Sequence, residues 1–325
     1  MRTRSSEVTL AAFAADVRKG LSQTPKTLSS QYFYDDLGSQ LFEAICQLPW
    51  YPITRAERRL LDRFAPAMVA KLPQLTELVE LGSGSGDKIA TLARALESRQ
   101  DKLHIHLIDI SDKALELSRS TLSRLPHVDV TTYPSTYEAG LRTIGQKRAA
   151  PGSTLVLFLG SNIGNFDPKV ALQLLGEIRR VLRPGDGLLL GADLIRPEAE
   201  LLLAYDDPLG VTAAFNKNLL QRMNAELGAD FVLDAWKHRA VFSASQARIE
   251  MHLVSRRNQK ARIPGAQIEV SFAEGETIWT ESSYKYTPES IVEMGQKADF
   301  CRQEQWIEPT ARFATTLFIA GSSMF

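Results

Sequence analysis

This sequence of 325 residues has few cysteines, no long apolar run and no net charge. Its two cysteines, Cys46 and Cys301, stand far apart and lack partners at the spacing of a disulfide framework or a zinc site, so a reducing cytoplasm fits best. The longest apolar run, residues 155–159, is too short to cross a bilayer, and the N-terminus does not resemble a signal peptide. The 38 basic and 38 acidic side chains cancel, which argues against nucleic acid as a partner.

The pattern of apolar residues changes twice along the chain. Before Thr76 it predicts helices over residues 6–20, from Ser39 and from Thr54, where Thr54 and Glu57 match a capping box. From Thr76 strands and helices alternate, with strands expected near 77–81, 104–109, 128–133, 154–160 and 187–193, and helices near 87–98, 111–123 and 168–182. This alternation is typical of an α/β protein with a parallel sheet and helices on its faces.

After Arg196 a helical stretch is expected to about Glu226, followed by strands near 248–255, 267–273 and 314–320. Two of these strands would extend the sheet at an antiparallel edge, while others would build a separate lid. We therefore predict a Rossmann-like domain over 56–196 and a discontinuous second domain, of α+β type, over 1–55 and 197–325.

The segment from Leu78 to Lys88, LVELGSGSGDK, joins an apolar strand to an expected helix through a glycine turn. Gly82, Gly84 and Gly86 let the backbone approach a ligand closely, and the helix directs its positive end to the same place, which predicts a nucleotide-like cofactor. The dinucleotide fingerprint G-x-G-x-x-G is not satisfied, because no glycine stands at its third position. A tight turn in some other α/β domain remains an alternative.

This E-x-G-x-G-x-G turn, an acid at the end of the next strand, and LRPGDGLLL at residues 182–190 resemble class I S-adenosylmethionine-dependent methyltransferases. Longer segments resemble, in order and wording, the histidine-specific Nα-methyltransferase family: residues 32–42, 48–55, 158–166, 204–216, 248–251 and 280–283. The resemblance covers roughly residues 25 to 320. It implies trimethylation of the α-amino group of free L-histidine to hercynine in ergothioneine biosynthesis, with S-adenosylmethionine as methyl donor and no metal. It also implies a class I methyltransferase domain and a second, substrate-binding domain made from both chain ends.

The resemblance assigns the cofactor site to Tyr34, Gly82, Lys88, Asp109, Thr136 and Tyr137. Asp109 would accept hydrogen bonds from ribose hydroxyls and Lys88 would meet the methionine carboxylate. The family carries an Asp-Phe pair where Thr136 and Tyr137 stand, so a hydroxyl replaces the carboxylate that would reach the adenine amino group. The alternatives are a solvated helix lysine for Lys88, a helix cap for Asp109 and a core tyrosine for Tyr34.

The histidine site is assigned in the same way to Tyr51, Asn165, Tyr205, Glu281, Ser282 and Ser283. Tyr51 and Asn165 are the candidates to orient the amine, and Tyr205 is a donor to the carboxylate. Glu281 and Ser283, two apart on an extended segment, would hydrogen-bond the imidazole. The alternatives are an ordinary turn residue for Asn165, a half-buried aromatic for Tyr205 and solvated positions for Glu281 and Ser283.

Three other functions remain open. The first is an Nα-methyltransferase for tryptophan or tyrosine, which Glu281 and Ser283 disfavour because an indole leaves a buried glutamate poorly satisfied. The second is a cofactor-binding protein without catalysis, and the third a dehydrogenase, which the missing third glycine disfavours. We expect a monomer with L-histidine as its small-molecule substrate, and no membrane or nucleic-acid partner.

Overall fold

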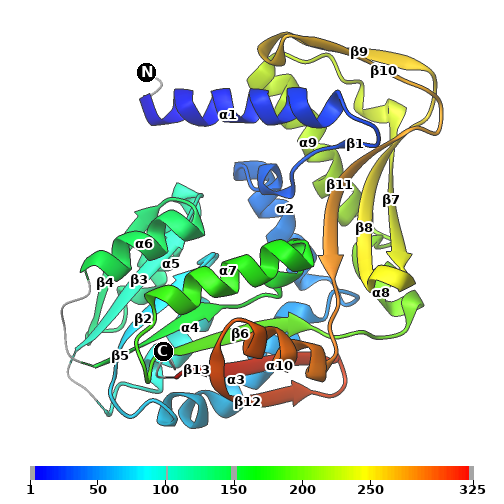
Figure 1. Cartoon of the computed structure of the whole chain (residues 1–325). Coiled ribbons are helices and arrows are strands. Elements are labelled where there is room, and N and C mark those ends of the chain that lie inside the picture. The colour runs from blue at the N-terminus through cyan, green and yellow to red at the C-terminus, as the bar shows by residue number, and fades with distance from the viewer. Residues whose placement is uncertain (1–3, 100–101, 148–151, 322–325) are drawn as a thin grey trace. The chain divides into compact units, whose positions relative to one another are not determined.

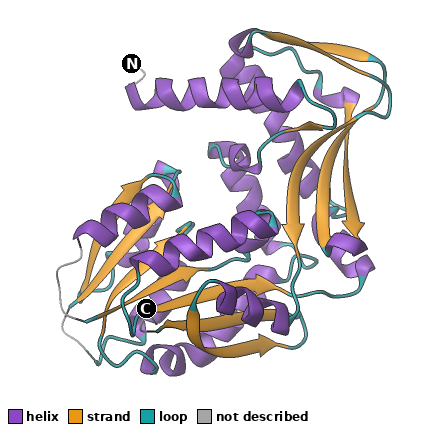
Figure 2. Cartoon of the chain, viewed as in Figure 1, coloured by secondary structure: helices purple, strands orange, loops and turns teal. Residues whose placement is uncertain are grey.

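The computed structural model describes residues 4–99, 102–147 and 152–321, which form two compact units (Figures 1 and 2). Residues Ile53–Ile195 and Tyr284–Phe325 contain the larger sheet and are called the seven-stranded unit. Residues Met1–Pro52 and Arg196–Ser283 are called the four-stranded unit.

The seven-stranded sheet has the order β12-β13-β6-β5-β2-β3-β4. Five neighbouring strands are parallel, while β13 is antiparallel to both β6 and β12. The strands are β2 (Leu75–Leu81), β3 (Leu103–Asp109), β4 (Val128–Pro134), β5 (Ser153–Phe158), β6 (Gly187–Asp193), β12 (Phe300–Glu308) and β13 (Phe313–Ala320). Because β2 lies between β3 and β5 in the middle of this sheet, the glycine turn that follows it opens at the carboxyl edge, where open α/β sheets bind ligands.

Helices cover both faces of this sheet (Figure 1). They are α3 (Ile53–Ala70), α4 (Asp87–Arg94), α5 (Asp112–Leu122), α6 (Tyr137–Lys147), α7 (Pro168–Val181) and α10 (Pro288–Lys297). Strands β2, β5 and β6 are buried along almost their whole length, as strands in the middle of a sheet with helices on both faces are. One core cluster joins β2, β5, β6 and β13 to α6, α7 and α10.

The four-stranded unit has a sheet of order β1-β11-β8-β7 and a separate β9-β10 hairpin. Its strands are β1 (Lys26–Thr27), β7 (Trp236–Ser243), β8 (Arg248–Ser255), β9 (Gln259–Ile263), β10 (Ile268–Phe272) and β11 (Thr277–Tyr284). Its helices are α1 (Arg4–Leu21), α2 (Asp36–Gln47), α8 (Glu198–Tyr205) and α9 (Val211–Leu227). Helices α8 and α9 pack on β7 and β8, and α2 packs on α9.

The predicted alternation from residue 76 to 193 is confirmed, with strand ends within about two residues. The compact units differ from the predicted domain boundaries at the C-terminal end, because Tyr284–Phe325 groups with the seven-stranded unit. There the sheet is extended by two strands, β13 antiparallel to β6 and β12 antiparallel to β13, of which the sequence pattern indicated only the first. The predicted capping box is wrong, since α3 begins at Ile53 and places Glu57 inside the helix.

Candidate functional site

The turn after β2 needs glycine for backbone conformation and for space. Gly82, Gly84 and Gly86 have φ angles of +78°, +52° and +75°. A Cβ on Gly82 would lie 2.9 Å from the Tyr137 hydroxyl oxygen and 3.1 Å from Asn162 Nδ2, so a larger residue would clash there. A Cβ on Gly84 would meet no heavy atom of the described chain within 4 Å. The turn is therefore closely packed at Gly82 and open at Gly84, as backbone facing a ligand would be.

The carboxylate of Asp109, at the end of β3, braces this turn. Its Oδ2 accepts from the Ser83 backbone N–H at 2.9 Å, and its Oδ1 accepts from the Ser111 backbone N–H at 2.8 Å. Burial raises the pKa of Asp109, and the backbone N–H groups partly oppose that rise. The carboxylate has acceptor capacity beyond these two bonds, so it can brace the turn and still receive ribose hydroxyls.

Lys88, in α4, forms an ion pair with a fully buried carboxylate. Its Nζ lies 2.7 Å from Glu57 Oε2, and both carboxylate oxygens of Glu57 accept from the Gly160 backbone N–H at 2.9 Å. The Lys88 side chain is 28% exposed and that of Glu57 is 0% exposed. Glu57 thus links Lys88 to the segment that follows β5, at the carboxyl edge of the sheet.

Glu80 is a buried acid beside the glycine turn that the site prediction omitted. It is 2% exposed, and Oε2 has no hydrogen-bond partner among the described residues. Burial raises its pKa to about 8; Lys88 lowers the pKa, while Glu57 and Asp109 raise it. The sequence signal was present, because Glu80 is the acid of the E-x-G-x-G-x-G pattern. A cation at this edge would stabilise the ionised form.

Thr136 and Tyr137 stand at the start of α6 and differ in their exposure to solvent. Thr136 is exposed, and its Oγ1 accepts from the Ala139 backbone N–H at 3.4 Å, so it caps the helix. Tyr137 packs edge-on against Phe158 with ring centroids 5.5 Å apart, and its hydroxyl faces Gly82. Burial raises the pKa of Tyr137, which keeps its hydroxyl protonated as a donor.

Asn165 ends the short 3-10 helix η2 (Asn162–Asn165) that follows β5. The segment is fixed from two sides. Ser161 Oγ accepts from the Asp193 backbone N–H at 2.9 Å, and the Tyr286 hydroxyl donates to the Ile163 carbonyl at 3.3 Å. The half-buried Asn165 is therefore carried on a rigid support at the carboxyl edge of the sheet.

In the four-stranded unit, three predicted tyrosines lie along one row of aromatic contacts, and a hydrogen bond joins a fourth predicted residue to its end. Tyr34 packs edge-on against Phe42, Phe42 against Tyr51, and Tyr51 against Tyr205, with centroid distances of 5.6, 6.3 and 6.2 Å. The Tyr205 hydroxyl lies 2.8 Å from Ser283 Oγ in a buried hydrogen bond. The structure thus brings together Tyr34, Tyr51, Tyr205 and Ser283.

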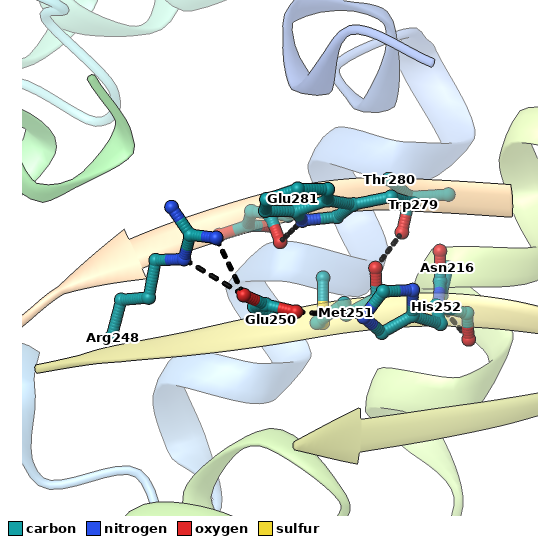
Figure 3. Close-up of polar contacts among 8 residues, drawn as sticks. All are labelled: Asn216, Arg248, Glu250, Met251, His252, Trp279, Thr280 and Glu281. Atoms are coloured by element: carbon teal, nitrogen blue, oxygen red, sulfur yellow. Dashed lines mark hydrogen bonds and ion pairs between the residues drawn. The ribbon is translucent and has the colours of Figure 1, made fainter. Parts of the chain in front are cut away.

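Glu281 and Ser282 are half-buried positions near the end of β11. The backbone carbonyl of Glu281 accepts from the Trp279 indole Nε1–H at 2.8 Å. Figure 3 shows Glu281 on β11 and Arg248 and Glu250 on the neighbouring β8.

The predicted residues divide between the two units. Gly82, Lys88, Asp109, Thr136, Tyr137 and Asn165 belong to the seven-stranded unit, and Tyr34, Tyr51, Tyr205, Glu281, Ser282 and Ser283 to the four-stranded unit. The residues predicted for the cofactor include Tyr34 of the four-stranded unit, and those predicted for histidine include Asn165 of the seven-stranded unit.

The described residues contain neither a cluster of metal-binding side chains nor a membrane-spanning helix. No group of three or more His, Cys, Asp or Glu side chains stands where it would hold a metal ion. Within the same residues, none of the helices has the length and apolar character needed to span a membrane.

The larger sheet has the topology of class I S-adenosylmethionine-dependent methyltransferases. Its antiparallel strand β13 lies between β6 and β12, and a glycine turn follows β2, the central one of the five neighbouring parallel strands. A family model described as "Histidine-specific methyltransferase, SAM-dependent" matches residues 13–320. The chain belongs to this family.

Three curated relatives are similar over most of this chain. Histidine N-alpha-methyltransferase of Mycolicibacterium smegmatis is 37% identical over 309 residues, covering 95% of each chain. Histidine N-alpha-methyltransferase of Mycobacterium tuberculosis is 38% identical, covering 94% of each. Ergothioneine biosynthesis protein 1 of Schizosaccharomyces pombe is 30% identical over 90% of this chain and 38% of that longer protein.

Proposed function

We propose that this chain transfers three methyl groups, one at a time, from S-adenosylmethionine to the α-amino group of free L-histidine, giving hercynine in ergothioneine biosynthesis. The observation that carries the proposal is the extent of the family match, residues 13–320, which includes residues of both units. It therefore takes in the cofactor turn and the predicted specificity residues Glu281 and Ser283. The relatives named for histidine methylation support the same substrate.

The residues at the carboxyl edge of the seven-stranded sheet fit this cofactor chemically. Gly82 and Gly84 permit close approach of the ligand, and Asp109 has oxygens for the ribose hydroxyls. Lys88 supplies a cation for the methionine carboxylate, and the buried Glu80 supplies an acceptor for the ammonium group. Tyr137, together with Tyr34 of the other unit, would face the adenine and the sulfonium group, while Thr136 contributes a hydroxyl.

For histidine, the proposal assigns recognition of the ring to the four-stranded unit. Glu281 would accept from an imidazole N–H, while Ser283, already bonded to Tyr205, would meet the other ring nitrogen. Ser282 would contribute its hydroxyl or backbone N–H. Tyr205 and Asn165 would hold the carboxylate and amine, and Tyr51 would face the amine.

S-adenosylmethionine, when bound, supplies a methyl group on a sulfonium that is open to in-line displacement. The chain must place the amine lone pair on that line, and such positioning supplies a large share of a rate enhancement. An ammonium has no lone pair, so a proton leaves before each transfer, to water or through the site. The trimethylated product carries a fixed positive charge, which the faces of Tyr51 and Tyr34 would stabilise.

We further propose that the enzyme acts as a cytoplasmic monomer without a metal ion and without a nucleic-acid partner. The two isolated cysteines and the balanced charge support this setting. The four-stranded unit would be its substrate-binding part.

The test is a mass-spectrometric assay of the purified chain with S-adenosylmethionine and free histidine, tryptophan or tyrosine. We expect histidine alone to gain methyl groups, up to three. Methylation of tryptophan or tyrosine instead would overturn the assignment of Glu281 and Ser283. Absence of any product, with cofactor binding intact, would indicate a binding protein.

A further inference from the structure

Trp279 of β11 lies in a compact polar cluster on one face of the four-stranded sheet (Figure 3). Side chains on β8 alternate between half-buried and buried, so Arg248, Glu250 and His252 share a face. The buried Ile249, Met251 and Leu253 occupy the opposite face. The polar face therefore presents three functional groups to the neighbouring strand β11.

These groups bond to one another, and two of them contact the indole of Trp279. Glu250 Oε1 accepts from Arg248 Nε at 2.8 Å and Nη2 at 2.6 Å, and Glu250 Oε2 lies 3.2 Å from His252 Nε2. The Arg248 guanidinium lies 4.5 Å from the centroid of the Trp279 ring. The His252 ring lies 5.9 Å from the same indole at an interplanar angle of 30°. Glu250 thus links the two side chains that contact the indole.

The indole is also tied to the backbone of β11. Its Nε1–H donates to the Glu281 carbonyl at 2.8 Å, which fixes the peptide group next to the Cα that carries the Glu281 side chain. In the same stretch, the buried Thr280 Oγ1–H donates to the Met251 carbonyl at 3.0 Å and ties β11 to β8. The backbone around Glu281 is therefore held by two side-chain bonds.

We propose that Trp279 is a positioning residue that fixes Glu281 for recognition of the substrate ring, and that Arg248, Glu250 and His252 hold the indole in place. This inference rests on the proposed function, in which Glu281 accepts a hydrogen bond from imidazole. A glutamate side chain has three rotatable bonds and loses conformational entropy when it binds a substrate. A fixed backbone at Glu281 and neighbouring side chains on the same face reduce that loss, because they restrict the side chain before the substrate binds.

The test uses Trp279→Phe, which keeps an aromatic ring under Arg248 and removes only the indole N–H and the second ring. The matched control is Trp236→Phe in the same unit. Trp236 is fully buried, and its Nε1 has no hydrogen-bond partner among the described residues. Histidine KM, kcat and the S-adenosylmethionine Kd would be measured for each variant, alone and combined with Glu281→Ala.

We expect Trp279→Phe to raise the histidine KM about fivefold, which corresponds to one hydrogen bond, with kcat and the cofactor Kd unchanged. Trp236→Phe should leave all three values at those of the wild type. In the Glu281→Ala background, Trp279→Phe should have no further effect, because the residue through which it acts is gone. If Trp279→Phe fails to fold, Arg248→Lys, which keeps the charge but loses the planar fork, should show the same dependence on Glu281.

An equal rise in KM with and without Glu281 would overturn the inference, because Trp279 would then act independently of it. An unchanged KM in Trp279→Phe would overturn it as well, and so would parallel losses in KM and cofactor Kd. Failure of the proposed function is distinguishable: the wild type would not methylate histidine, or Glu281→Ala alone would leave histidine kinetics unchanged.

Discussion

Replacing Gly191 with alanine should lower the free energy of unfolding of the seven-stranded unit by about 3 kcal/mol. Gly191 lies in β6, and a Cβ there would stand 2.0 Å from Glu57 Oε1 and 3.1 Å from Phe313 Cζ. The methyl group must displace the Glu57 carboxylate, which accepts from Gly160 and pairs with Lys88.

The magnitude follows from the environment of that carboxylate. Breaking a buried ion pair costs about 3–5 kcal/mol, and overpacking a core costs about 1–3 kcal/mol. Lys88 is 28% exposed and recovers solvation when the pair is broken, so the two costs do not add in full and the expected total is about 3 kcal/mol. Cofactor affinity should fall too, since Lys88 would lose the residue that holds it.

The assay is urea denaturation followed by far-UV circular dichroism, comparing midpoints at equal slope. Gly176→Ala in α7 is the control, because a Cβ there meets no described heavy atom within 4 Å, and it should raise stability by about 0.5–1 kcal/mol. Glu57→Asp in the Gly191→Ala background should recover part of the loss by withdrawing the carboxylate. A Gly191→Ala midpoint equal to that of the wild type would refute the reasoning.

Three further predictions concern single side chains. Burial raises the pKa of Glu80 to about 8, so the folded chain binds this proton more tightly than the unfolded chain does. The free energy of unfolding should therefore fall as pH rises from about 4.5 to about 8. Glu80→Gln should remove at most about 5 kcal/mol of that fall, measured by urea denaturation across this pH range, and parallel curves for the two proteins would contradict it. Asp109→Asn replaces one acceptor oxygen by an amide group that cannot accept from a backbone N–H, so the free energy of unfolding should fall by about 1–3 kcal/mol. Cofactor affinity, measured by calorimetry, should fall more than tenfold. Unchanged affinity would remove Asp109 from the cofactor site. Tyr205→Phe loses the 2.8 Å bond to Ser283 and should raise the histidine KM about threefold to tenfold at constant cofactor Kd, whereas a change in the cofactor Kd alone would exclude the substrate role.

The sequence predicted the alternating part of the fold because local signals and tertiary pairing agree there. Strands β5 and β6 contain the apolar runs LVLF and LLL, as buried parallel strands require, and β2 is buried although it includes Glu77 and Glu80. The C-terminal strand pair was harder to assign. Pairing of β13 with β6 joins residues far apart in sequence, and no local pattern indicates which sheet a strand will join.

The site prediction depended on motifs, and it omitted residues whose roles depend on packing. The positive φ angles of Gly82, Gly84 and Gly86 are what the glycine pattern implied. Glu57 matched a helix cap in the sequence, yet it lies in the core because Gly191 leaves room for its carboxylate and the Gly160 backbone N–H donates to it. Trp279 carried no motif, and its contacts with Arg248 and Glu281 exist only once β8 and β11 are neighbours.

The most direct test of the central claim is to identify the methylated atom. The purified chain would be incubated with histidine and S-adenosylmethionine carrying a 13C-labelled methyl group, and the product examined by NMR. We expect one labelled resonance from three equivalent methyl groups, correlated with the histidine α-proton. Labelled methyl groups correlated with imidazole ring protons, or no labelled histidine at all, would contradict it.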